Sequence, residues 1–121
     1  MSQKTLAIDL DGVIHAYTTG FGNGELYDPP VDGALYALSK LEKDYKIIIF
    51  TTRAADGHFA TFRGKTGEDA IRAWLDYWCE RKGIQLAYRY KITAVKPPAL
   101  AYIDDRAVRF TNWTDIRKMF Q

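Results

Sequence analysis

Residues 6–17 read LAIDLDGVIHAY, and within this stretch an apolar run ends at two acidic residues, Asp9 and Asp11. Residues 5–10 are short, apolar and followed by Gly12, which is typical of a buried strand that stops at a turn. Residues two apart on a strand point to the same side. We therefore expect Asp9 and Asp11 to face a common site just beyond the end of this strand.

Two further apolar segments are predicted to form strands followed by polar residues. Residues 46–51, KIIIFT, contain three consecutive isoleucines, which indicates a strand buried on both faces, as in a parallel sheet. Residues 99–103, ALAYI, are a third strand and run into the acidic pair at 104–105. Weaker strand patterns lie at 89–93, RYKIT, and at 108–110, VRF.

Helical patterns lie between these strands. Apolar residues recur at steps of three and four across 31–41 and again across 71–78. Thr66 and Gly83 suit the start and the end of the second helix. Residues 112–120 are expected to form a short closing helix. The alternation of strands and helices predicts an α/β fold with a mostly parallel sheet, in which ligands bind at the carboxyl ends of the strands.

Two polar segments interrupt the alternation. Residues 12–28 separate the first strand from the first helix, and their glycines and asparagine predict a hairpin or flap. Residues 53–66 read as a long loop on the substrate side, a length that is usually functional or disordered. His15 and His58 lie in these segments, and we expect both to be solvated or packed. Neither segment is long enough to be an independent domain, so a single domain without a cap is expected over residues 1–121.

Composition narrows the class of protein. The 17 basic and 15 acidic residues leave a net charge of +2, which gives no strong case for binding nucleic acid or a membrane surface. No apolar run approaches the roughly 18 residues of a membrane span, and no secretory signal opens the chain. The single cysteine, Cys79, excludes an internal disulfide and suits a reducing compartment. We expect a cytoplasmic protein.

The acidic residues predict a metal site. Two close carboxylates repel each other unless a positive charge lies between them, and Mg²⁺ prefers oxygen ligands. In a parallel sheet both acidic pairs would emerge at the same edge. We therefore expect Asp9, Asp11, Asp104 and Asp105 to converge on Mg²⁺.

The segments DLDGV, IIIFTTR and KPPALAYIDDR resemble, in this order, the motifs of the haloacid dehalogenase superfamily, chiefly phosphatases and related phosphoryl-transfer enzymes. That family has Asp-x-Asp after its first strand, Ser or Thr after the second, and then a Lys and a pair of acids. The matching residues are Asp9, Asp11, Thr51, Lys96, Asp104 and Asp105. The resemblance covers residues 6–110. It implies a three-layer, Rossmann-like sandwich with helices on both faces of the sheet, in the branch without a cap domain.

The resemblance also implies a reaction, the Mg²⁺-dependent hydrolysis of phosphate monoesters through an aspartyl-phosphate. Asp9 would be the nucleophile that attacks phosphorus in line. Asp11 would bind the metal through its backbone carbonyl, which leaves its side chain free to protonate the leaving oxygen and then to take a proton from water.

The remaining matched residues would bind phosphate or metal. Thr51 would hydrogen-bond the transferring phosphoryl group, and Lys96 would neutralise charge on the nucleophile and on the phosphate. Asp104 would hold the metal, with Asp105 close behind it. Arg53 directly follows the two threonines, and we expect it to bind the substrate as well.

The absence of a cap leaves the substrate class open to more than one interpretation. A small phosphorylated molecule, such as a sugar phosphate or a nucleotide, is the first expectation, and a partner subunit could then cover the site. An open site would also suit a nucleic acid end, as in a polynucleotide 3′-phosphatase. A third reading is a non-catalytic binding module that has kept the scaffold.

Overall fold

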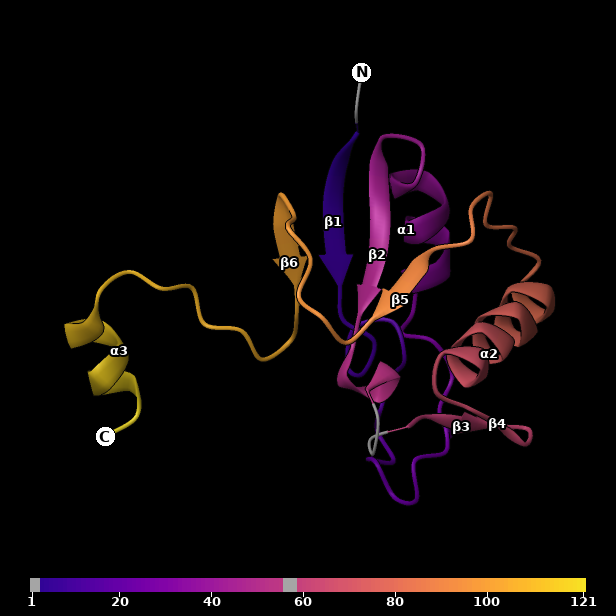
Figure 1. Ribbon diagram of the computed structural model, residues 1–121, viewed down its shortest axis with the longest axis horizontal. Helices are drawn as coiled ribbons and strands as arrows, with labels where there is room; N and C mark the ends of the chain where they lie inside the picture. Colours follow the sequence, from indigo (N-terminus) through magenta and orange to yellow (C-terminus); the bar gives the residue numbers. More distant parts are fainter. Residues whose placement is uncertain (1–2, 56–58) are drawn as a thin grey trace.

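The computed structural model describes residues 3–55 and 59–121, so the expectation for His58 lies outside the described residues. The fold is α/β (Figure 1). A parallel sheet with the strand order β5-β2-β1-β6 is made of β1 (Lys4–Ile8), β2 (Tyr45–Phe50), β5 (Lys91–Thr93) and β6 (Ala101–Ile103). The helices are α1 (Ala34–Leu41), α2 (Gly67–Lys82) and α3 (Trp113–Met119). A 3₁₀ turn (Thr52–Ala54) precedes a small antiparallel hairpin of β3 (Thr61–Phe62) and β4 (Lys65–Thr66).

The register of the sheet brings three strand ends together. Strand β1 lies between β2 and β6, and Ile8 is aligned with Ile49 on one side and with Ile103 on the other. Since all three strands run in the same direction, the residues that follow them emerge at one edge of the sheet. The prediction of a parallel sheet is confirmed.

The hydrophobic core lies on one face of the sheet. Alternate strand residues point into it, and α1 and α2 supply the opposing side chains, which include Leu35, Leu38, Ile71 and Trp74. The family resemblance implies helices on both faces of the sheet, whereas α1 and α2 both contribute to the same core. In the described residues the third helix, α3, lies apart from the sheet (Figure 1). The connection from β5 to β6 spans only residues 94–100 and contains no helix.

The predicted ends of α2 are confirmed. Thr66 is the N-cap, and Gly83 ends the helix with a φ of 66°, a left-handed conformation that glycine adopts at little cost. Acidic residues in the first turn and basic residues in the last complement the helix dipole. The predicted strand at 108–110 is wrong: these residues have no regular structure, because none of the strands in the described part of the chain lies beside them to pair with their backbone.

The two polar segments are joined to each other. The backbone N–H of Leu26 donates to the carbonyl of Thr61, and the N–H of Thr61 donates to the carbonyl of Gly24. The segment 12–28 is therefore fastened to β3 across the carboxyl edge of the sheet. None of the helices among the described residues is both long and apolar enough to cross a membrane.

Candidate active site

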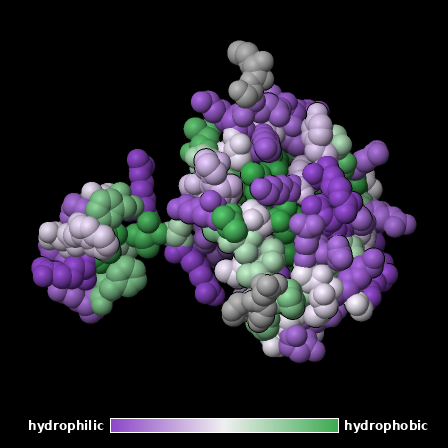
Figure 2. All heavy atoms as spheres, in the orientation of Figure 1, coloured by the Kyte–Doolittle hydropathy of each residue, from purple (hydrophilic) through white to green (hydrophobic). Residues whose placement is uncertain are grey.

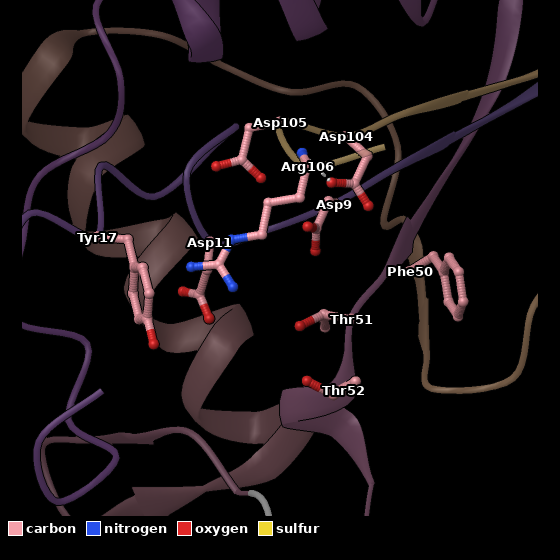
Figure 3. A pocket seen from close by; sticks show the side chains of 9 residues that line it. All are labelled: Asp9, Asp11, Tyr17, Phe50, Thr51, Thr52, Asp104, Asp105 and Arg106. Carbon is pink, nitrogen blue, oxygen red and sulfur yellow. Dashed lines mark hydrogen bonds between the residues drawn. The ribbon is translucent and has the colours of Figure 1, made fainter. Parts of the chain in front are cut away.

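Three carboxylates converge at the carboxyl edge of the sheet (Figure 3). Asp9 directly follows β1, and Asp104 and Asp105 directly follow β6. One carboxylate oxygen of each residue lies within 4.8 Å of one from each of the others. The parallel pairing of β1 with β6, fixed in part by the hydrogen bond from the Asp9 N–H to the Ile103 carbonyl, produces this convergence.

Gly12 allows Asp105 to approach the turn after β1. Its φ is +80°, and a β-carbon at this position would collide with the Asp105 carboxylate. Any other residue would therefore both strain the backbone and push one acid out of the cluster. This close contact explains why a glycine follows the second aspartate of the DLDG sequence.

The electrostatics of Asp9 reflect its surroundings. Burial, together with the negative charges of Asp104, Asp11 and Asp105, raises the pKa of Asp9 from 3.8 to about 6, although a hydrogen bond from the Leu10 N–H partly opposes the rise. Burial and the neighbouring carboxylates thus both disfavour the ionised form of Asp9, and a divalent cation bound between the three acids would stabilise that form. Three carboxylates with oxygens this close are a donor set that fits Mg²⁺.

The side chain of Asp11 is held by two other residues. The Nε of Arg53 donates to Oδ2 of Asp11 at 2.7 Å, and Nδ1 of His15 lies 2.9 Å from Oδ1. The Nε2 of His15 accepts a hydrogen bond from the backbone N–H of Asp28, so the ring proton is on Nδ1 and is donated to Asp11. Both carboxylate oxygens of Asp11 are thereby fixed in orientation.

These contacts set the ionisation of Asp11. Burial alone would raise the pKa of this carboxyl, but the hydrogen bonds from His15 and Arg53 and the charge of Arg53 lower it overall. Asp9 and Asp11 are only two residues apart, yet their pKa values move in opposite directions. Asp11 is therefore the readily ionised member of the pair, positioned beside the triad of Asp9, Asp104 and Asp105 without belonging to it.

Arg53 lies in the interior of the protein. It is 1% exposed, its Nη1 donates to the carbonyl of Gly24 at 2.7 Å, and its guanidinium stacks with the rings of Phe21 and Tyr17. The sequence predicts that Arg53 binds substrate, and the structure places its guanidinium behind Asp11 and outside the lining of the acidic pocket. Buried His15, expected to be merely packed or solvated, shares in orienting Asp11. The only hint of this contact in the sequence was that His15 lies four residues after Asp11.

A pocket of about 340 Å³ opens in front of these acids. It is lined by Asp9, Asp11, Tyr17, Phe50, Thr51, Thr52, Asp104, Asp105 and Arg106. Thr51 is buried, and its hydroxyl accepts a hydrogen bond from the Arg53 N–H at 3.2 Å. In Figure 3 the hydroxyls of Thr51 and Thr52 point toward the acids, whereas the Phe50 ring points away. The structure thus brings Thr51 into the same pocket as Asp9 and Asp11.

The positive charge at the pocket comes from Arg106, which is not among the residues that match the family motifs. Lys96 lies with its Nζ 4.5 Å from the centre of the Tyr102 ring, and it lines a neighbouring groove that also includes Asp9. Arg106 instead lines the acidic pocket, and its side chain extends across it toward Asp11 (Figure 3). Its backbone N–H donates to Oδ1 of Asp104 at 2.8 Å. The only sequence signal for Arg106 was its place immediately after the acidic pair.

Fold and site together define an α/β protein with a parallel sheet and an acidic triad at its carboxyl edge. Comparison of the chain with protein-family models, with curated proteins and with solved structures gives no match.

Proposed function

We propose that this protein is a Mg²⁺-dependent phosphatase of the haloacid dehalogenase type, which hydrolyses phosphate monoesters through an aspartyl-phosphate. The observation that carries the proposal is the convergence of Asp9, Asp104 and Asp105 in a pocket that also contains Asp11 and Thr51. The sequence motifs and the parallel sheet support the same assignment. The preferred substrate is a small phosphorylated molecule, in keeping with the size of the pocket.

In this proposal Asp9 is the nucleophile. Its carboxylate attacks phosphorus in line, the bond from phosphorus to the leaving oxygen breaks, and the phosphoryl group is transferred to Asp9. Mg²⁺ held by Asp9, Asp104 and Asp105, with the Asp11 backbone carbonyl, would supply the positive charge that lets an anionic nucleophile approach an anionic phosphate. Thr51 donates a hydrogen bond to the phosphoryl group.

Asp11 transfers the protons. A phosphate dianion beside Asp11 raises the pKa of its carboxyl, so the protonated form is available to donate to the leaving oxygen. In the second step the ionised carboxylate takes a proton from the water that attacks the aspartyl-phosphate, and Asp9 and inorganic phosphate are released. Arg53 and His15 hold Asp11 in the orientation that both steps need.

Hydrolysis of a chromogenic aryl phosphate tests the proposal. We expect turnover with Mg²⁺ and its loss on addition of EDTA, with recovery when excess Mg²⁺ is restored. A panel of nucleotides, sugar phosphates and an oligonucleotide bearing a 3′-phosphate then identifies the substrate class, with the 5′-phosphorylated oligonucleotide as its matched control. Absence of turnover at every pH and with every divalent metal tested would favour the hypothesis of a non-catalytic binding module.

The polynucleotide 3′-phosphatase is the second candidate. It is favoured by the exposure of Asp104, Asp105 and Arg106, which leaves the acidic cluster open to a large substrate. This candidate predicts a kcat/KM for the 3′-phosphorylated oligonucleotide that is well above the values for nucleotides and sugar phosphates. Such a result would favour a polynucleotide 3′-phosphatase over a phosphatase of small molecules.

Arg106 and Lys96 are expected to differ in their effects on substrate binding. Because Arg106 lines the acidic pocket, Arg106→Gln should raise KM for an aryl phosphate by about tenfold, the scale of one charge-assisted hydrogen bond. Lys96→Gln should raise KM much less, since the Lys96 ammonium lies over the Tyr102 ring. Steady-state kinetics at saturating Mg²⁺ measure both variants. The reverse order of effects would show that Lys96 turns into the pocket when substrate binds.

A further inference from the structure

The C-terminal segment 107–121, which follows the residues of the candidate site, extends away from the body and exposes large apolar side chains; we call it the arm (Figure 1). Trp113 is 75% exposed and Phe120 is 74% exposed, and none of the residues of α3 is buried. With Ile116 between them, they have the spacing of three and four that lines one face of a helix. The arm thus presents an apolar stripe without a partner among the described residues.

This helix needs a partner to be stable. Its seven residues are well below the roughly 12–15 at which isolated helices become marginal in water. It nevertheless has a specific start, because the Asn112 side chain accepts a hydrogen bond from the Asp115 N–H at 2.9 Å. A capped helix with an apolar stripe and no buried residue is typical of an element that is completed by packing against another surface.

The same chain carries an uncovered apolar surface. On the sheet face opposite the core Ala7 and Ile48 are themselves buried, and the exposed apolar side chains at its edge are those of Tyr102, which is aligned with Ala7, and of Leu100, two residues earlier in the chain. A groove of about 840 Å³ runs along this face and along the start of the arm, and Leu100, Tyr102 and Val108 contribute exposed apolar surface to it. Figure 2 shows apolar side chains over the sheet and a second group on the arm. We call this surface the open face.

The direction of the arm determines which copy of the open face it can reach. The segment between Ile103 and α3 contains no helix or strand and carries α3 away from the body beyond β6, the edge strand (Figure 1). The six residues 107–112 can span roughly 20 Å when extended, which is the reach available to α3 beyond β6. A second copy placed beside β6 would receive the arm and would place its own arm on the first copy, which is the closed arrangement expected of a two-fold dimer.

The area available matches a stable dimer. The rings of Phe110, Trp113 and Phe120 are between 57% and 75% exposed, so each arm offers roughly 400 Å² of aromatic surface at about 200 Å² a ring. Two arms and two receiving faces would together bury about 1,600 Å², the standard size of a specific interface.

We propose that two copies of this chain exchange their arms, so that α3 of each packs on the open face of the other. The proposal concerns association alone and holds whether or not the protein is a phosphatase. The exchange covers the exposed apolar stripe of α3, the open face and the neighbourhood of the edge strand in one step.

Light scattering coupled to gel filtration tests the exchange on the full chain. The wild-type protein at tens of micromolar should have twice the 13.8 kDa mass of the chain. The arm variant Trp113→Glu/Phe120→Glu should be monomeric, with a dissociation constant raised at least about 100-fold, as for the loss of two central interface residues. The matched control, Tyr36→Glu/Tyr88→Glu, changes two aromatic residues exposed elsewhere and should remain dimeric.

Mixing two different variants tests reciprocity. Leu100→Glu alters the open face and should also weaken the dimer. Combined with the arm variant, it should form a heterodimer by native mass spectrometry, because one arm and one face remain intact in that pair. Circular dichroism like that of the wild type confirms that each variant is folded. A monomeric wild type, a dimer that survives the arm variant, or no heterodimer on mixing would each overturn the proposal.

Discussion

Asp9→Asn is expected to abolish phosphatase turnover while making the metal-free protein more stable. As the nucleophile of the proposed reaction, Asp9 cannot be replaced by an amide, so kcat should fall by roughly 10⁴-fold or more, the scale of losing a covalent nucleophile. The stability effect has the opposite sign, because the carboxylate of Asp9 is partly desolvated by burial and is also repelled by Asp104, Asp11 and Asp105.

The pH dependence of that stability follows from the same pKa. The folded protein holds the Asp9 proton up to about pH 6, whereas the unfolded chain releases it near 3.8, so the folded state is favoured below this range. As pH rises from about 4 to about 6, ionisation of Asp9 removes stability, on the order of 1–3 kcal/mol in all. Asp9→Asn lacks this loss and should be the more stable protein at pH 7 in EDTA.

Urea unfolding with EDTA across pH 4 to 8, beside aryl phosphate turnover with Mg²⁺, measures both effects of Asp9→Asn. Asp44→Asn, at an exposed acid in the turn after α1, is the control and should change neither. Excess Mg²⁺ should stabilise the wild type more than Asp9→Asn, since one ligand of the proposed site is missing. Equal turnover in the wild type and Asp9→Asn would refute the proposed nucleophile, and equal metal-free stability at pH 7 would refute the raised pKa of Asp9.

Arg53→Leu is expected to destabilise the protein by about 3 kcal/mol. Leucine removes the buried guanidinium and with it the hydrogen bonds to Asp11 and to the Gly24 carbonyl, and it leaves the Asp11 carboxylate without its charged partner. A loss of this size lowers the melting temperature by roughly 10 °C in a domain of this length. The pKa of Asp11 should rise at the same time, because Arg53 contributes to its lowering.

Thermal and urea unfolding compare Arg53→Leu with Arg89→Leu, at an exposed arginine where little change is expected. The comparison also separates two roles for Arg53. An arginine that only binds substrate would leave stability unchanged and raise KM when it is replaced. Such a result would restore the role that the sequence predicts for Arg53 and would contradict its packing behind Asp11.

The local patterns of the chain predicted most of its secondary structure because each depends on neighbouring residues. The isoleucine run of β2 and the positions of the two ends of α2 are examples, and both are confirmed. Strand 108–110 was predicted wrongly because VRF has the composition of a strand but no partner for its backbone. The expectation of helices on both faces of the sheet depended on where α3 packs, and the local sequence pattern carries no information about that position.

Sequence alone determined that acids would follow two apolar strands, because composition and the two-residue period of a strand place Asp9, Asp11, Asp104 and Asp105 at strand ends. Only the tertiary structure decided which of them share a cluster and which partners each acquires. The pairing of β1 with β6 brings Asp9 beside Asp104. Asp11 instead forms hydrogen bonds with the buried His15 and with Arg53, which is 42 residues away in the chain. The physical reason is that charge interactions depend on distance and burial in space, and neither can be read from separation along the chain.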